Sequence, residues 1–321
     1  MGQAKAVLAK VVGDVAPGLF YYLADKAKRH DLTVQTTRDA ISVIDKKTLR
    51  IVRVARENNI YLLDIINDFE YYFSSVEPVQ MRSDGKTYSL VDFSTPRLHN
   101  VHGFDEFPVM FSSLAEPFQT CQQYLDFAQL SFGETVIDLG AYSALTSIAF
   151  ANAVGPTGRV VAFEPDPLNR QAATINLAAR KRRTGLDNIT LDSSAVSGTA
   201  GTLTFSAEGA MGSSFTTFVG NHRRETVQVQ AITLDDVVKR FGLTRVDFIK
   251  MDIEGAERDV ITKSGGFIAR YRPRFIIEPH MVDGHLTSVE MTAFLNELGY
   301  TCAIIDQLGT TLPLMTASPN N

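Results

Sequence analysis

The chain has 321 residues, 45% of them hydrophobic and 21% charged, which is enough for one large domain with an appendage or for two modest domains. Its net charge of −5 is unevenly spread: residues 1–60 carry 11 Lys and Arg against 6 Asp and Glu, and the rest carries 20 against 30. An acidic body argues against a nucleic-acid enzyme, which needs a basic face. Two cysteines without metal-ligand spacing, and no signal-peptide pattern, predict a cytoplasmic protein.

The first 35 residues are predicted to form an amphipathic helical segment. Apolar residues recur at helical spacing over residues 3–29, and a bend is expected at Pro17. We expect this helix to dock on its own protein or on a second copy of the chain in a homo-oligomer. Because several lysines and arginines lie along it, weak contact with an anionic membrane surface is the alternative.

Residues 36–117 are predicted to form a small mixed α+β subdomain. Residues 48–56 alternate like a strand, residues 61–73 carry the apolar stripe of an amphipathic helix, and residues 79–93 indicate a hairpin that turns at Asp84-Gly85. His99 and His102 follow in a loop. Two histidines at this spacing rarely bind a metal, so they are left without a function.

From residue 118 to the C-terminus, strand patterns alternate with helix patterns, which predicts βαβ units and a doubly wound, mostly parallel sheet. The strands are expected at residues 135–139, 159–164, 188–193, 246–252 and 274–278. Ligands of such sheets bind beyond the carboxyl ends of the strands. An extra strand pair is expected around residues 206–225, whose Gly- and Ser-rich sequence fits a cover over the site or a disordered loop.

The first three strand ends predict a ligand that contains ribose. A glycine after the first strand lets the backbone pass close to a ligand, and the next helix offers unpaired N–H groups to an anion. Glu164, after the second strand, can accept two hydrogen bonds from a ribose diol, which adenosine cofactors and NAD both present. Small residues after the third strand fit beside an adenine, although a plain loop explains them equally well. The predicted cofactor-binding residues are Asp138, Gly140, Ala141, Tyr142, Glu164, Asp166, Ser194 and Ala195.

The fourth and fifth strand ends carry an unusual number of charges. Lys250, Asp252 and Glu254 occupy alternate positions and therefore share one face of an otherwise apolar strand. They are expected to meet either a ligand or one another. The fifth strand adds Glu278 and His280, so five polar side chains converge if the two strands are neighbours.

These motifs resemble the FkbM-type methyltransferases, which use S-adenosylmethionine. The resemblance covers residues 126–305 and is carried by VIDLGAYSA (136–144), GRVVAFEPDPLN (158–169), AVS (195–197) and VDFIKMDIEGAE (246–257). It implies an α/β fold with a Rossmann-like, class I methyltransferase sheet of seven strands, and methyl transfer, generally to a hydroxyl. Ala144 departs from the pattern, which often has glycine there. We expect residue 144 to lie in the first turn of the helix, where alanine is the better helix former.

The resemblance favours an O-methyltransferase that acts on a hydroxyl of a sugar, glycolipid or secondary metabolite, with Asp252, His280, Lys250 and Glu254 as catalytic residues. Asp252 and His280 are the candidate bases, and Lys250 would hold the acceptor oxygen or neutralise the neighbouring acids. The Asn/Asp-Pro-Pro-aromatic signature of many N-methyltransferases is missing from the fourth strand. A divalent metal held by Asp252, Glu254 or Glu278 together with His280 is an alternative, but we assign none.

Two alternatives have less support from the sequence. An NAD-dependent dehydrogenase would fit the acid at the second strand end, but the full Gly-x-Gly-x-x-Gly motif is absent. A non-catalytic binding protein with the same fold is supported only by Ala144 and the N-terminal addition.

Overall fold

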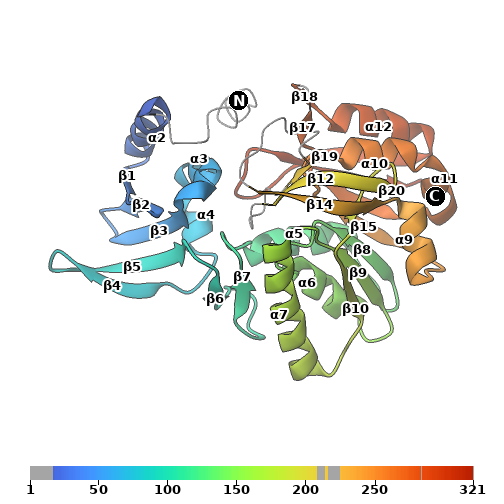
Figure 1. The fold of residues 1–321 in the computed structure, drawn as a ribbon, viewed down its shortest axis with the longest axis horizontal. Helices are drawn as coiled ribbons and strands as arrows, with labels where there is room; N and C mark the ends of the chain where they lie inside the picture. The colour runs from blue at the N-terminus through green and yellow to red at the C-terminus, as the bar shows by residue number, and fades with distance from the viewer. Residues whose placement is uncertain (1–16, 208–213, 216–224, 283, 321) are drawn as a thin grey trace. The chain divides into compact units, whose positions relative to one another are not determined.

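A computed structural model of the chain describes residues 17–207, 214–215, 225–282 and 284–320 (Figure 1). The chain divides into two compact units, one of residues 1–119 and 308–311 and the other of residues 120–307 and 312–321. The first part of the predicted N-terminal helix lies outside the described residues. Among the helices that the structure describes, none has the length and apolar character needed to cross a membrane.

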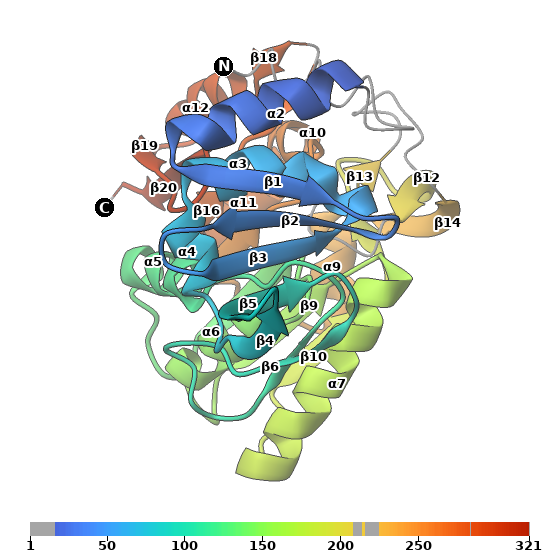
Figure 2. The same cartoon turned by 90° about the vertical axis from the view of Figure 1, so that its left-hand side faces the viewer.

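The first unit is built on a five-stranded sheet in the order β1-β2-β3-β5-β4. Helix α2 packs along β1, as Figure 2 shows. The strand predicted at residues 48–56 and the hairpin at residues 79–93 are confirmed. The elements are α2 (Pro17–Arg29), β1 (Leu32–Thr36), β2 (Ala40–Asp45), β3 (Arg50–Ala55), η1 (Arg56–Tyr61), α3 (Leu62–Asn67), α4 (Phe69–Phe73), β4 (Val79–Ser83), β5 (Lys86–Phe93), β6 (Arg97–His99) and β7 (Val109–Phe111).

The helix predicted at residues 61–73 is broken into two short helices at Asp68. The Asp68 side chain accepts a hydrogen bond from the Tyr71 N–H and so caps the start of α4. His99 is a core residue here, because its ring packs between Phe93 and Phe111. Burial lowers the pKa of His99 to about 4, which keeps the ring neutral.

The second unit is built on a seven-stranded sheet in the order β10-β9-β8-β15-β16-β20-β19, in which β20 is antiparallel to both of its neighbours. The strand order switches between β8 and β15, which are adjacent and parallel. The predicted α/β class I methyltransferase fold is therefore confirmed. The strands are β8 (Thr135–Leu139), β9 (Arg159–Phe163), β10 (Ile189–Asp192), β15 (Phe248–Met251), β16 (Arg274–Ile277), β19 (Tyr300–Asp306) and β20 (Pro313–Pro319).

Both faces of this sheet are buried under helices. Phe248 of β15 packs in a cluster with α5 and α6, whereas the next residue, Ile249, packs in the cluster that contains α9 to α12. Such alternation is expected of a central strand that is covered on both sides. The helices are α5 (Phe118–Ala128), α6 (Leu145–Val154), α7 (Pro167–Thr184), α9 (Leu234–Phe241), α10 (Glu257–Lys263), α11 (Gly265–Tyr271) and α12 (Ser288–Glu297).

A second, four-stranded sheet in the order β11-β14-β12-β13 contains the predicted extra strand pair. It consists of β11 (Ala195–Val196), β12 (Gly201–Ala207), β13 (Ser214–Phe215) and β14 (Glu225–Ile232), and a short hairpin, β17 (Met281–Val282) with β18 (His285–Leu286), lies elsewhere. The predicted cover over residues 206–225 falls largely outside the described residues. Helix α9 begins at a capping box of Thr233 and Asp236.

Candidate cofactor and acceptor site

The turn after β8 passes tightly against the end of β15. Gly140 has a left-handed backbone (φ 81°), and a Cβ at this position would overlap the carbonyl oxygen of Asp252. The N–H groups of Gly140 and Ala141 both donate to the carbonyl of Phe163, at 3.1 and 2.9 Å. Only glycine satisfies both the conformation and the contact, and this turn joins the ends of three strands.

Two residues of this turn that are not glycine also have left-handed backbones, Tyr142 (φ 49°) and Ala144 (φ 62°). The expectation that Ala144 lies in the first turn of the helix is wrong, because α6 begins at Leu145 and Ala144 is its N-cap. A side chain with a Cβ costs roughly 1–2 kcal/mol in this conformation, and glycine avoids that cost. The left-handed backbone at residue 144 therefore explains why the family pattern often has glycine at this position.

Glu164 ties the first turn to the end of β9. Its Oε2 accepts from the Tyr142 N–H at 2.7 Å, and its Oε1 accepts from the Asp166 N–H at 2.8 Å. Burial raises the pKa of Glu164 to about 8, although these two N–H groups act in the opposite direction. Asp166 caps α7 by accepting from the N–H groups of Leu168 and Asn169.

Asp138 and Lys250 lie beneath the turn rather than on its surface. Their side chains are 0% and 5% exposed, and Lys250 Nζ lies 3.6 Å from Asp138 Oδ1. Lys250 Nζ also donates to the carbonyl of Gly140 at 2.6 Å, and Ser147 donates to the second carboxylate oxygen of Asp138. Burial raises the pKa of Asp138, although Lys250 and Ser147 act against it. Both residues therefore support the turn of residues 140–144 that follows β8, which we call the cofactor turn.

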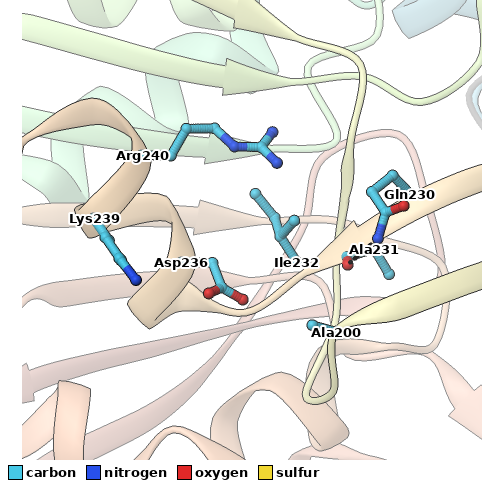
Figure 3. Close-up of a pocket in the computed structure, with 7 residues that line it drawn as sticks. All are labelled: Ala200, Gln230, Ala231, Ile232, Asp236, Lys239 and Arg240. Carbon is cyan, nitrogen blue, oxygen red and sulfur yellow. Dashed lines mark hydrogen bonds between the residues drawn. The ribbon is translucent and has the colours of Figure 1, made fainter.

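The third strand end is held by Arg240. Its Nη1 donates to the carboxylate of Asp192 and, at 2.9 Å, to Ser194 Oγ. Ser194 and Ala195 are both buried. Arg240 also lines a pocket of about 500 Å³ between α9 and β14 (Figure 3). Its lining includes none of the residues predicted for the site: Ala200, Gln230, Ala231, Ile232, Asp236, Lys239 and Arg240.

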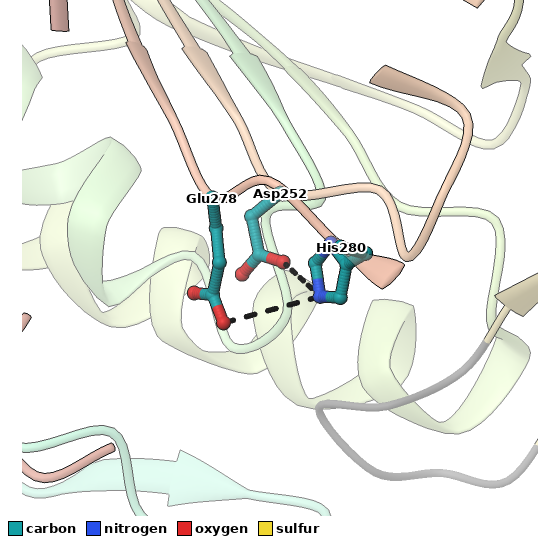
Figure 4. A group of neighbouring side chains, drawn as sticks. All are labelled: Asp252, Glu278 and His280. Carbon is teal, nitrogen blue, oxygen red and sulfur yellow. Dashed lines mark ion pairs between the residues drawn. The ribbon is translucent and has the colours of Figure 1, made fainter. Parts of the chain in front are cut away.

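The ends of β15 and β16 bring the predicted acids and His280 together (Figure 4). His280 Nε2 lies 3.9 Å from Asp252 Oδ1, 3.9 Å from Glu278 Oε1 and 3.5 Å from Glu254 Oε2. On its other side, Asp252 Oδ2 lies 3.8 Å from Lys250 Nζ. Glu254 lies in a turn beyond the strand (φ 55°), so its predicted place on the same strand face as Lys250 is wrong.

Glu257 is a member of this cluster that sequence reasoning missed. It is fully buried at the start of α10, where it accepts from the N–H groups of Ile253 and Gly255, and His280 Nδ1 lies 3.0 Å from its Oε1. Burial alone would lower the pKa of His280, but Glu254, Glu257 and Glu278 raise it well above its usual range. Glu257 is the last residue of the IEGAE motif, so the sequence did point to this position. Its contact with His280 could not be predicted, because the two residues are 23 positions apart in the chain.

Residues 138–302, just over half of the chain, match the family model described as "Methyltransferase FkbM domain". The chain belongs to the FkbM methyltransferase family. Its cofactor is S-adenosylmethionine, which the methyltransferases of this family use. The NAD-dependent alternative is also at odds with the sheet, because the order typical of dinucleotide-binding folds has no antiparallel strand inserted beside the fifth.

Solved structures give more distant likenesses. An FkbM methyltransferase from Methylobacillus flagellatus has 15% identity and a TM-score of 0.47, over 82% of this chain and 55% of that one. This chain thus spans about half the length of that protein. An O-methyltransferase from Thermotoga maritima has 15% identity and a TM-score of 0.40, over 80% and 82%. The O-methyltransferase TomG from Streptomyces achromogenes has 13% and 0.40, over 64% and 82%. No curated protein matches the sequence.

The residues at the strand ends fit the cofactor. Each carboxyl oxygen of Glu164 accepts one backbone N–H and keeps one further hydrogen-bonding position, which a ribose hydroxyl can meet as donor or acceptor. At Gly140 the backbone of the turn passes so close to the Asp252 carbonyl oxygen that a side chain would not fit. Asp166 accepts a hydrogen bond from the Leu168 N–H, which fixes the loop after β9. Ser194 accepts one from Arg240, which fixes the loop after β10.

Proposed function

We propose that this protein is an O-methyltransferase that acts on a hydroxyl of a small molecule or glycan, such as a sugar, a glycolipid or a secondary metabolite. Bound S-adenosylmethionine supplies an electrophilic methyl group on a sulfonium. The protein must hold the acceptor hydroxyl in line with that methyl and remove its proton. Positioning and general-base assistance are both large contributions, the second typically worth ~10²–10⁴-fold.

The observation that carries this proposal is the position of Asp252. Its backbone N–H donates to the carbonyl of Leu139 at 3.0 Å, which fixes it beside the Gly140 turn. Its carboxylate is 27% exposed and lies between Lys250 and His280. A carboxylate whose backbone is fixed beside the Gly140 turn and whose oxygens are still open to solvent suits the role of a base for an acceptor hydroxyl.

The geometry favours Asp252 over His280 as the base. Both ring nitrogens of His280 face carboxylates, with Nδ1 on Glu257 and Nε2 toward Asp252, Glu254 and Glu278. The ring is thus surrounded by acceptors, whereas a base needs a nitrogen that is directed at the substrate. Lys250 is engaged with the carbonyl of Gly140, so we assign it to positioning the turn and Asp252.

The test uses S-adenosylmethionine with a ¹³C-labelled methyl group and amino sugars that carry both hydroxyl and amine groups. We expect the label on oxygen, which the carbon chemical shift of the product identifies. Asp252→Asn should lower kcat by ~10²–10⁴-fold and leave S-adenosylhomocysteine affinity within about twofold. Label on nitrogen, or a fully active Asp252→Asn variant, would overturn the proposal.

The partners named from the sequence stay predictions. These are the homo-oligomer, the weak membrane-surface contact of the N-terminal helix and the lack of a nucleic-acid partner. Size-exclusion chromatography with light scattering, and flotation with anionic vesicles, would test the first two.

A further inference from the structure

We propose that Asp252, Glu278 and His280 form a binding site for a divalent metal ion of the oxygen-preferring kind, such as Mg²⁺ or Mn²⁺. The sequence alone led us to assign no metal to these residues. The inference comes from the arrangement of the side chains at the ends of β15 and β16 (Figure 4).

The three ligand atoms have the spacing that a shared ion requires. One oxygen of Asp252, one oxygen of Glu278 and one nitrogen of His280 all lie within 4.8 Å of one another. His280 Nε2 is 3.9 Å from each of the two carboxylate oxygens, which is too far for a hydrogen bond. Ligands bound to one ion at about 2.1 Å lie roughly 3–4.2 Å apart, so small side-chain movements would complete the site.

Each proposed ligand is oriented by a neighbour that leaves one atom facing the centre. Glu257 accepts from His280 Nδ1 at 3.0 Å, which directs Nε2 inward. Gln307 donates to Glu278 Oε2 at 2.9 Å, and Oε1 faces His280. Lys250 Nζ lies near Asp252 Oδ2, and Oδ1 faces His280. Carboxylates that hold the second nitrogen of a histidine are the usual outer partners of metal-bound histidines.

A simple ion pair explains this geometry less well. A protonated Nε2 among carboxylates would form one short, charge-assisted hydrogen bond, at about 2.7–2.9 Å. Here Nε2 stands between three carboxylates at 3.5–3.9 Å, and among the residues that the structure describes the hydrogen bond of the ring runs from Nδ1 to Glu257. Glu254 Oε2, at 3.5 Å, would be a further ligand or a hydrogen-bond partner of a metal-bound water.

The ion would lie at the same edge of the sheet as the Gly140 turn. With the ion bound, Asp252 would serve as its ligand, and the ion would assist deprotonation by binding the acceptor oxygen and lowering the pKa of its hydroxyl. This role rests on the proposed O-methylation, but the metal site itself does not.

The test is a titration of chelator-stripped full-length protein with Mn²⁺. The concentration of free Mn²⁺ is measured at each step from its electron paramagnetic resonance signal. We expect one saturable site, with affinity at least tenfold weaker in Asp252→Asn and in Glu278→Gln. Asp235→Asn and Glu297→Gln make the same chemical changes at exposed positions and should bind Mn²⁺ as the wild type does. Using two separate ligand variants keeps the test decisive if one of them misfolds.

A spectroscopic readout separates a histidine-containing site from a mere acidic surface. Electron spin-echo spectra of the Mn²⁺ complex should show coupling to a histidine nitrogen, and His280→Gln should abolish it. Equal Mn²⁺ affinity in the wild type and both ligand variants, or no nitrogen coupling in the wild type, would overturn the site. Because acceptor methylation has no part in these measurements, failure of the proposed O-methylation would leave the result intact, and the reverse also holds.

Discussion

At the scale of single residues, the cofactor turn combines tight packing with conformational strain. Ala144 holds a left-handed backbone (φ 62°) at the N-cap of α6 and is fully buried. Its neighbour Tyr142 is also left-handed, and its N–H is held by Glu164. Strain of this kind persists only where surrounding contacts determine the conformation, and here these contacts join the ends of β8 and β9.

Ala144→Gly should cost little stability. Glycine removes a cost of roughly 1–2 kcal/mol in the folded state, but it adds about 0.5–1 kcal/mol of unfolded-state entropy and loses a buried methyl group worth about 0.8 kcal/mol, so the free energy of unfolding should change by less than about 1 kcal/mol. Urea denaturation measures this difference. Ala149→Gly, a buried alanine inside α6 without left-handed strain, is the matched control and should destabilise by about 2 kcal/mol. Equal destabilisation by the two variants would contradict the assignment of strain to Ala144.

Glu164 should make stability depend on pH. Its pKa is raised by burial from 4.5 to about 8, although the N–H groups of Asp166 and Tyr142 and the charge of Lys250 lower it. The unfolded chain thus loses this proton near pH 4.5, while the folded chain keeps it until about pH 8. Folding binds a proton in this window, so the free energy of unfolding falls as the pH rises from 4.5 to 8.

The measurement is the melting temperature of wild type and Glu164→Gln at several pH values between 5 and 9. The wild type should lose stability more steeply with rising pH than the variant does, because glutamine cannot titrate. Parallel curves would show that Glu164 keeps an ordinary pKa in the folded protein.

At the scale of elements, the site depends on how closely β8 and β15 end beside each other. A Cβ on Gly140 would overlap the carbonyl oxygen of Asp252, which belongs to the backbone and cannot swing aside. The same residue needs a left-handed conformation (φ 81°). A change in the geometry of the cofactor turn would therefore also displace Asp252.

Gly140→Ala should cost about 3 kcal/mol or more and should abolish S-adenosylhomocysteine binding. Gly185→Ala is the matched control, because Gly185 is also left-handed (φ 73°) but has nothing within 4 Å of the added Cβ. That variant should lose only about 1 kcal/mol and keep its affinity. Calorimetric titration and urea denaturation of both variants give the comparison. Equal losses would mean that conformation alone, not the contact with Asp252, requires glycine at position 140.

The elements that the sequence predicted well are those whose own residues determine them. The buried parallel strands around Ile137 and Ile249 were predicted from their mostly apolar runs. The edge strand β19 was not identified from its residues, because most of its side chains are exposed or half-buried. Its partner β20 begins and ends at a proline and is placed by pairing with β16, which is distant in sequence.

The site follows the same division. The residues at strand ends could be listed from the sequence, since strand ends are where ligands bind in this kind of sheet. The sequence could not show that Lys250 turns toward the carbonyl of Gly140, that Glu257 holds His280, or that Ala144 is left-handed. Each of these depends on a contact between separate elements or on a backbone angle that side-chain patterns do not encode.

At the scale of the whole molecule, the candidate site lies within one of the two compact units. All residues of the candidate site, from Asp138 to His280, belong to the second unit. The first unit has its own buried residues, Val43, Val52 and Ile65 among them. It also includes residues 308–311, and Tyr72 Oη donates to the carbonyl of Gly309 at 2.7 Å. We therefore expect cofactor binding to stabilise one unit directly and the other little.

Scanning calorimetry should show two transitions, of which S-adenosylhomocysteine raises one. At a ligand concentration of about 100 times Kd, the stabilisation should be about 2.7 kcal/mol. Ile65→Ala, in the core of the first unit, should lower the other transition by about 2–5 kcal/mol of unfolding free energy and leave affinity unchanged. Ile268→Ala, in the core of the second unit, should lower the ligand-sensitive transition instead. A single transition that responds to the ligand and to both substitutions would contradict this expectation, because it would show that the two units unfold together.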